Sequence, residues 1–91
     1  MSTTPLETFE QACTKLRASR ERLRLDRQTY NSYKRQAQRA SMPVEQQQQY
    51  CAQALARVTT SISAVTQARA DAEAAYEAIP VAERPVLDYW D

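Results

Sequence analysis

Apolar residues recur along the second half of the chain at alternating intervals of four and three residues. This spacing is a heptad pattern, which gives an α-helix one continuous apolar stripe. It predicts a long helix over about residues 44–79, whose stripe must be buried against another helix. The positions of this stripe are Val44, Gln48, Cys51, Leu55, Val58, Ile62, Val65, Arg69, Ala72, Tyr76 and Ile79, with polar residues only at 48 and 69.

The first half of the chain carries a second stripe with the same rhythm. Thr4 can cap a helix there, Pro5 suits a first helical position, and Glu7 completes a capping-box spacing. We therefore expect a helix over about residues 5–40, with Leu25 off the stripe and either exposed or in contact with another chain. Its apolar row is Leu6, Phe9, Cys13, Leu16, Leu23, Tyr30 and Ala37, and the alternate row becomes cationic at Arg20, Arg27 and Lys34.

Pro43 separates the two helical segments. A proline disfavours the α conformation at the preceding residue, which is Met42. The chain is therefore predicted to turn at residues 41–43 and fold back, which pairs Phe9 with Tyr76 and Leu23 with Ile62. The predicted fold class is all-α, a coiled-coil-like antiparallel two-helix hairpin forming one domain over residues 1–91, with a tail at 80–91. The alternative is one continuous helix kinked at Pro43, which would bury its stripes against other copies.

The composition narrows the range of functions. Glycine and histidine are both absent, which disfavours glycine-rich phosphate loops and leaves little support for catalysis. The two cysteines lie on the apolar stripes and lack metal-ligand spacing, which favours small buried side chains over reactive ones. No cofactor, metal or enzymatic activity is expected. The chain shows neither a secretory signal nor a membrane-spanning apolar run, so a cytoplasmic location is expected.

The net charge of +1 conceals an uneven distribution. Residues 1–40 hold nine Lys or Arg and four acids, whereas residues 41–91 hold three Arg and seven acids. We call the cations on one side of the first helix the cationic stripe. They either lay their stems over the apolar stripe and pair with acids, which we favour, or bind phosphates beside Tyr30 and Tyr33. The cationic stripe consists of Arg17, Arg20, Arg24, Arg27 and Lys34.

Two further features suggest contacts with other chains. A row of small residues beside the apolar stripe of the second helix would let another helix approach closely, which favours two hairpins forming a four-helix bundle. Alternatively these residues only favour helix formation. The row consists of Ala54, Ser61, Ala68 and Ala75. The tail carries Leu87, Tyr89 and Trp90, which either cover the open end of the hairpin or dock onto a partner.

These features predict a cytoplasmic, homodimeric, non-enzymatic module that binds a protein partner, of the small adaptor, chaperone or inhibitor type. Its contact surfaces would be the cationic stripe and the aromatic tail. The alternative function is nucleic-acid binding through the basic face of the first helix. A third hypothesis is a structural rod that assembles into filaments or larger particles.

Overall fold

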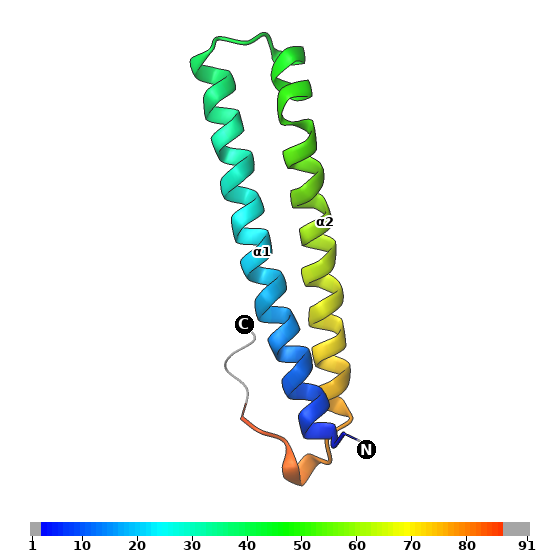
Figure 1. The fold of residues 1–91 in the computed structure, drawn as a ribbon. Helices are drawn as coiled ribbons and strands as arrows, with labels where there is room; N and C mark the ends of the chain where they lie inside the picture. The colour runs from blue at the N-terminus through cyan, green and yellow to red at the C-terminus, as the bar shows by residue number, and fades with distance from the viewer. Residues whose placement is uncertain (1–2, 87–91) are drawn as a thin grey trace.

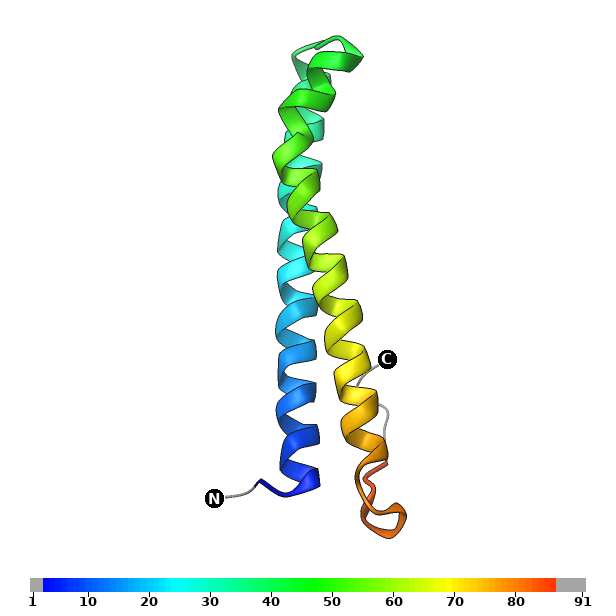
Figure 2. The same cartoon turned by 90° about the vertical axis from the view of Figure 1, so that its right-hand side faces the viewer.

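The computed structural model, which describes residues 3–86, is an antiparallel helical hairpin (Figure 1). Helix α1 spans Pro5–Arg39, helix α2 spans Val44–Glu77, and the short 3₁₀ helix η1 spans Val81–Glu83. The part of the chain that the structure describes contains no strand. The all-α hairpin is confirmed, and the continuous kinked helix is not formed. The molecule measures 59 × 23 × 18 Å, and Figure 2 shows the two helices crossing at a shallow angle.

Helix α1 begins with the predicted Thr4 cap and with Pro5 as its first residue. The Oγ1 atom of Thr4 accepts a hydrogen bond from the backbone N–H of Glu7 at 3.2 Å, and Pro5 is the first helical residue. Thr4 therefore satisfies one of the N–H groups that have no partner within the helix, and the carboxylate of Glu7 lies at the positive end of the helix dipole.

The corner between the helices is built without glycine. Ser41 adopts a left-handed conformation with φ of 54°, the conformation that glycine usually supplies after a helix. Its N–H donates to the carbonyl of Gln38 at 3.1 Å, and the N–H of Met42 donates to the carbonyl of Ala37 at 3.1 Å. These two bonds form a Schellman motif, which satisfies the last carbonyls of α1 and turns the chain into Pro43.

The end of α2 is closed by Arg84, which the sequence pattern did not indicate. Its Nε donates to the carbonyl of Ile79 at 2.9 Å, and its Nη2 donates to the carbonyl of Glu77 at 3.0 Å. The same guanidinium lies 5.4 Å from the centre of the Tyr76 ring. A cation at this position satisfies helix-terminal carbonyls and lies at the negative end of the helix dipole.

The best-packed part of the core lies at the open end of the hairpin. Phe9, Cys13 and Ile79 form a buried cluster, against which Ala75 and Tyr76 pack. The rings of Phe9 and Tyr76 are 5.4 Å apart between centroids and tilted. This contact confirms the predicted pairing of Phe9 with Tyr76 and fixes the antiparallel register at this end.

The buried side of α2 differs from the predicted stripe. Cys51, Val58 and Ala72 are buried, but the positions that complete the interface are Ala54 and Ser61 rather than their neighbours. Leu55 and Ile62 are 47% and 44% exposed, and Gln48 and Arg69 are exposed as well. The predicted stripe is therefore wrong at these four exposed positions, because α2 is rotated about its axis there, whereas Tyr76 packs against the core as predicted.

The buried side of α1 also differs from the predicted stripe. Leu16 is buried and Leu23 and Tyr30 are half-buried, but Asp26 lies in the interface instead of Arg27. A stripe through Arg27 and Lys34 would bury cations, whereas the alternative buries one carboxylate that a serine hydroxyl can satisfy. Rotating both helices in this way keeps the cations in water. It also exposes Leu55 and Ile62.

Candidate interaction surface

The cationic stripe lies on α1. Arg17, Arg24, Arg27 and Lys34 are exposed, and Arg20 is half-buried. The members of the stripe differ in their surroundings.

Arg24 is engaged within its own helix. Its Nη2 and Nε donate to the two carboxylate oxygens of Glu21 at 2.6 and 3.0 Å. These hydrogen bonds hold the pKa of Glu21 below its ordinary value, since they favour the ionised carboxylate. They also raise the pKa of Arg24. The charge of Arg24 is thus largely balanced by Glu21, so Arg24 would attract an acidic partner only weakly.

Arg27 and Lys34 are different, because neither forms an ion pair with any residue in 3–86. Lys34 lines a shallow groove between the helices near the corner. Its other lining residues come from both helices, and together they make a surface that is apolar with polar edges. They are Tyr30, Val44, Gln47, Gln48, Cys51 and Leu55.

Exposed apolar side chains accompany these cations. Val44 is 69% exposed, and Leu55 and Ile62 are each nearly half exposed. A separation of seven residues returns a helix to the same side within about 20°. Ile62 therefore continues the line of Leu55, and Arg27 continues the line of Lys34. We call these five residues, Arg27, Lys34, Val44, Leu55 and Ile62, the cationic–apolar face.

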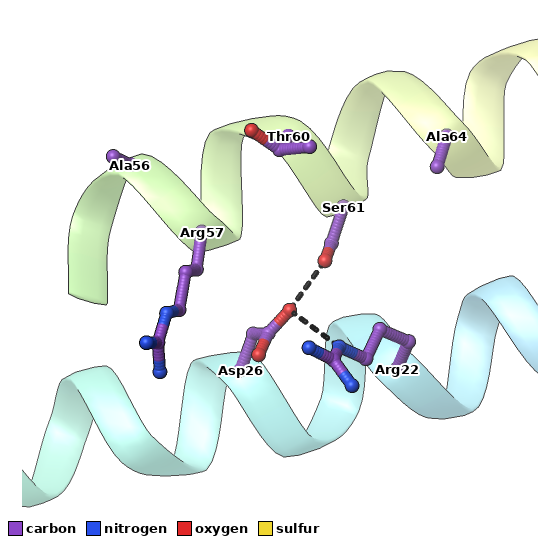
Figure 3. A pocket seen from close by; sticks show the side chains of 7 residues that line it. All are labelled: Arg22, Asp26, Ala56, Arg57, Thr60, Ser61 and Ala64. Carbon is purple, nitrogen blue, oxygen red and sulfur yellow. Dashed lines mark hydrogen bonds and ion pairs between the residues drawn. The ribbon is translucent and has the colours of Figure 1, made fainter. Parts of the chain in front are cut away.

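The opposite side of the hairpin holds a buried polar contact (Figure 3). The hydroxyl of Ser61 on α2 donates a hydrogen bond to Oδ2 of Asp26 on α1, and Nε of Arg22 lies 3.5 Å from the same oxygen. Asp26 is only 9% exposed. Figure 3 shows Arg57 extending toward α1 on the far side of Asp26 from Arg22. This contact ties the two helices together at mid-length.

Sequence reasoning missed the role of Asp26, which is not among the residues of the apolar row predicted for the first helix. The spacing of Asp26 could have indicated this role. It lies three residues after Leu23 and four before Tyr30, which fits the heptad spacing of a buried stripe. Its partner Ser61 belongs to the row of small residues. The structure places that row inside the hairpin, with Ala54 and Ser61 buried and Ala68 and Ala75 half-buried. In this arrangement the row contacts α1 of the same chain, so it does not present the surface expected for self-association.

A second polar contact on this side lies close to the corner. The rings of Tyr33 and Tyr50 meet edge to face with centroids 5.4 Å apart. The Tyr50 hydroxyl donates to Oε1 of Gln36 at 2.8 Å. Tyr33 is therefore engaged with α2, whereas Tyr30 lines the groove on the cationic–apolar face.

Cys13 and Cys51 are both buried as free thiols. Burial raises the pKa of the Cys13 thiol, and the nearby Arg17 offsets this only in part. A protonated thiol within an apolar cluster is a poor nucleophile, which is consistent with a packing role.

The predicted tail residues Leu87, Tyr89 and Trp90 lie outside the described residues. Within residues 3–86, no cluster of three or more His, Cys, Asp or Glu side chains could hold a metal ion. None of the described helices is both long and apolar enough to cross a bilayer. Comparison with protein-family models, curated proteins and solved structures finds no match to this chain.

Proposed function

We propose that this protein is a non-enzymatic interaction module whose hairpin binds a protein partner through the cationic–apolar face. The observation that carries the proposal is the combination of half-exposed Leu55 and Ile62 with Arg27 and Lys34 on one side of the hairpin. Contiguous apolar surface rimmed by charge is typical of protein-binding sites. The hairpin supplies the rigid support, in the manner of a small adaptor, chaperone or inhibitor.

The apolar content of this face favours protein over nucleic acid. Nucleic-acid affinity comes from neutralising several phosphates, whereas only two of the five residues of this face, Arg27 and Lys34, are cationic. Val44, Leu55 and Ile62 offer nothing to a phosphate backbone, and they gain from contact with apolar side chains.

Site-specific photo-crosslinking in cells of the native host tests the proposal. A photoreactive amino acid is placed at Leu55, and a matched variant carries it at Ala64, which lines the opposite groove beside Ser61. We expect protein adducts from position 55 that are absent from position 64. Nucleic-acid adducts at position 55, or the same adducts at both positions, would contradict the proposal.

Nucleic-acid binding through the cationic stripe is the second candidate, supported by the exposure of Arg17, Arg27 and Lys34. Its signature is affinity for a random oligonucleotide that falls steeply as salt rises from low to physiological concentration. Undetectable binding at low salt would exclude it.

Self-association of the chain would have to use a surface other than the row of small residues. The small residues on which a dimer was expected lie within the hairpin, so a dimer would need another surface. The mass of the protein in solution, measured by light scattering, tests for a dimer or a larger assembly independently of the crosslinking experiment.

A further inference from the structure

We infer that the cationic–apolar face binds an acidic amphipathic α-helix, which completes a three-helix bundle with α1 and α2. This inference rests on the proposed function and specifies the chemistry of the partner. The shape of the groove, the charge around it and the poor fit of a second copy each support it.

The shape of the groove favours a helix. Tyr30 and Lys34 on α1 and Val44 and Leu55 on α2 line one groove that runs between two nearly antiparallel helices. An extended strand adds to the unpaired edge of a sheet, and the described residues include no strand. A third helix instead packs its apolar stripe between two others, and its heptad repeat matches the spacing of Leu55 and Ile62.

The charge of the face selects an acidic helix. Arg27 and Lys34 rim the apolar positions on the α1 side, and neither is ion-paired with a residue in 3–86. On the other side, α2 has no acidic residue between Glu45 and Asp71. Carboxylates flanking the apolar stripe of a partner helix would therefore meet cations, whereas a basic helix would meet only repulsion.

A second copy of the chain fits this face poorly. A two-fold interface uses the same patch twice, so it would gather Arg27 and Lys34 of both copies with no carboxylate on the patch to offset them. The acidic end of α2 cannot serve as the docked helix either. Its apolar side, including Ala72, and the adjoining Ile79 are already buried within the hairpin.

Designed peptides test the inference on the full chain. The probe is a helical peptide of about four heptads with leucine at both core positions and glutamate at the flanking positions. One control peptide carries lysine in place of glutamate, and another has the acidic composition in scrambled order. By fluorescence anisotropy at low salt, we expect the acidic peptide to bind about ten-fold or more tightly than either control.

Two neighbouring substitutions provide matched protein controls. Lys34→Glu should weaken binding of the acidic peptide about ten-fold and improve binding of the lysine peptide, whereas Arg35→Glu, the same charge change on the adjacent residue, should leave both nearly unchanged. Leu55→Gln should also weaken binding, and circular dichroism checks that each variant is folded.

Equal binding of the acidic and lysine peptides, equal effects of Lys34→Glu and Arg35→Glu, or no binding of the acidic peptide would each overturn the inference. Crosslinks between two copies of the chain at position 55 would overturn it as well. Crosslinking of a different protein at position 55 would leave the proposed function standing even if the acidic peptide failed, so the two failures are distinguishable.

Discussion

At the scale of single residues, Ser41 carries the clearest local strain. A side chain with a Cβ costs roughly 1–2 kcal/mol in the left-handed region, and Ser41 occupies it with φ of 54°. The Schellman hydrogen bonds of the corner hold it there. This strain follows from a chain without glycine that must still turn sharply after α1.

Replacing Ser41 by glycine should relieve this strain. We expect Ser41→Gly to raise the free energy of unfolding by up to about 1 kcal/mol, because part of the gain is offset by the freedom of glycine in the unfolded chain. Urea denaturation followed by circular dichroism measures the change. Ser41→Ala, which keeps the Cβ, is the control and should bring no gain. Destabilisation by glycine would show that the corner is not strained.

The raised pKa of Cys13 predicts a pH-dependent reactivity. Because burial favours the neutral thiol, folded protein keeps the Cys13 proton to higher pH than the ordinary thiol value of 9.0. A Cys51→Ser variant should therefore react slowly with a thiol reagent at pH 8, and its rate should still be rising above pH 9. In urea the same thiol should react at the rate of a free cysteine. Fast labelling of folded protein at pH 8 would contradict this placement.

Asp26 and Ser61 form the buried polar contact most sensitive to substitution. Ser61→Ala would leave a buried carboxylate without its hydroxyl donor, and we expect a loss of about 1–3 kcal/mol in the free energy of unfolding. The double variant Asp26→Ala/Ser61→Ala should lose less than the two single losses combined, with a coupling of about 1 kcal/mol.

Arg22→Gln is the control for this pair. Its side chain is 71% exposed, so its ion pair with Asp26 contributes little and the substitution should cost less than about 1 kcal/mol. Chemical denaturation of the unaltered protein, Asp26→Ala, Ser61→Ala and the double variant gives the double-mutant cycle. Additive losses would mean that Asp26 and Ser61 do not stabilise each other.

At the scale of the helices, the sequence predicts the hairpin but not its rotation. Capping by Thr4 and pairing of Phe9 with Tyr76 follow from local chemistry and heptad spacing, and both are observed. The heptad row of α2 is ambiguous, however, since Cys51 and Val58 belong equally to a stripe through Leu55 and to one through Ala54. Hydrophobicity favours the first, while the cost of burying Arg27 on the partner helix decides for the second.

The rotation of α2 can be tested by substituting adjacent residues. Ala54 is buried, so Ala54→Leu should overfill the interface and lower the free energy of unfolding by about 1–3 kcal/mol. Leu55 is nearly half exposed, so Leu55→Ala should cost less than about 2 kcal/mol, the low end of the range for a buried leucine. Thermal and urea denaturation measure both. A larger loss for Leu55→Ala than for Ala54→Leu would indicate that the stripe through Leu55 is the buried one.

The candidate surface could be predicted only in part. The sequence shows the cationic stripe, but it predicts that the apolar residues beside it, Leu55 and Ile62, belong to the core. Sequence patterns rank positions by hydrophobicity, whereas the exposure of Leu55 and Ile62 depends on how the charges of the opposite helix are kept in water. The sequence likewise places Ser61 in the row of small residues beside the predicted stripe, whereas its contact with Asp26 shows that it faces α1.

At the scale of the whole molecule, binding of an acidic helix and pairing of two copies of the chain should respond to salt in opposite directions. Binding of an acidic helix joins opposite charges, so added salt should weaken it. Pairing of two cationic–apolar faces joins like charges, so added salt should screen their repulsion and leave the apolar attraction of Leu55 and Ile62.

The protein alone should therefore have the mass of one 10.4 kDa chain at low salt and a higher average mass at high salt, by light scattering. Removing the charge at both cations, in Arg27→Gln/Lys34→Gln, should produce the same increase without salt. A discrete dimer at low salt whose mass does not respond to salt or to these substitutions would show that the chain pairs through a different surface, and it would leave the cationic–apolar face open to its partner.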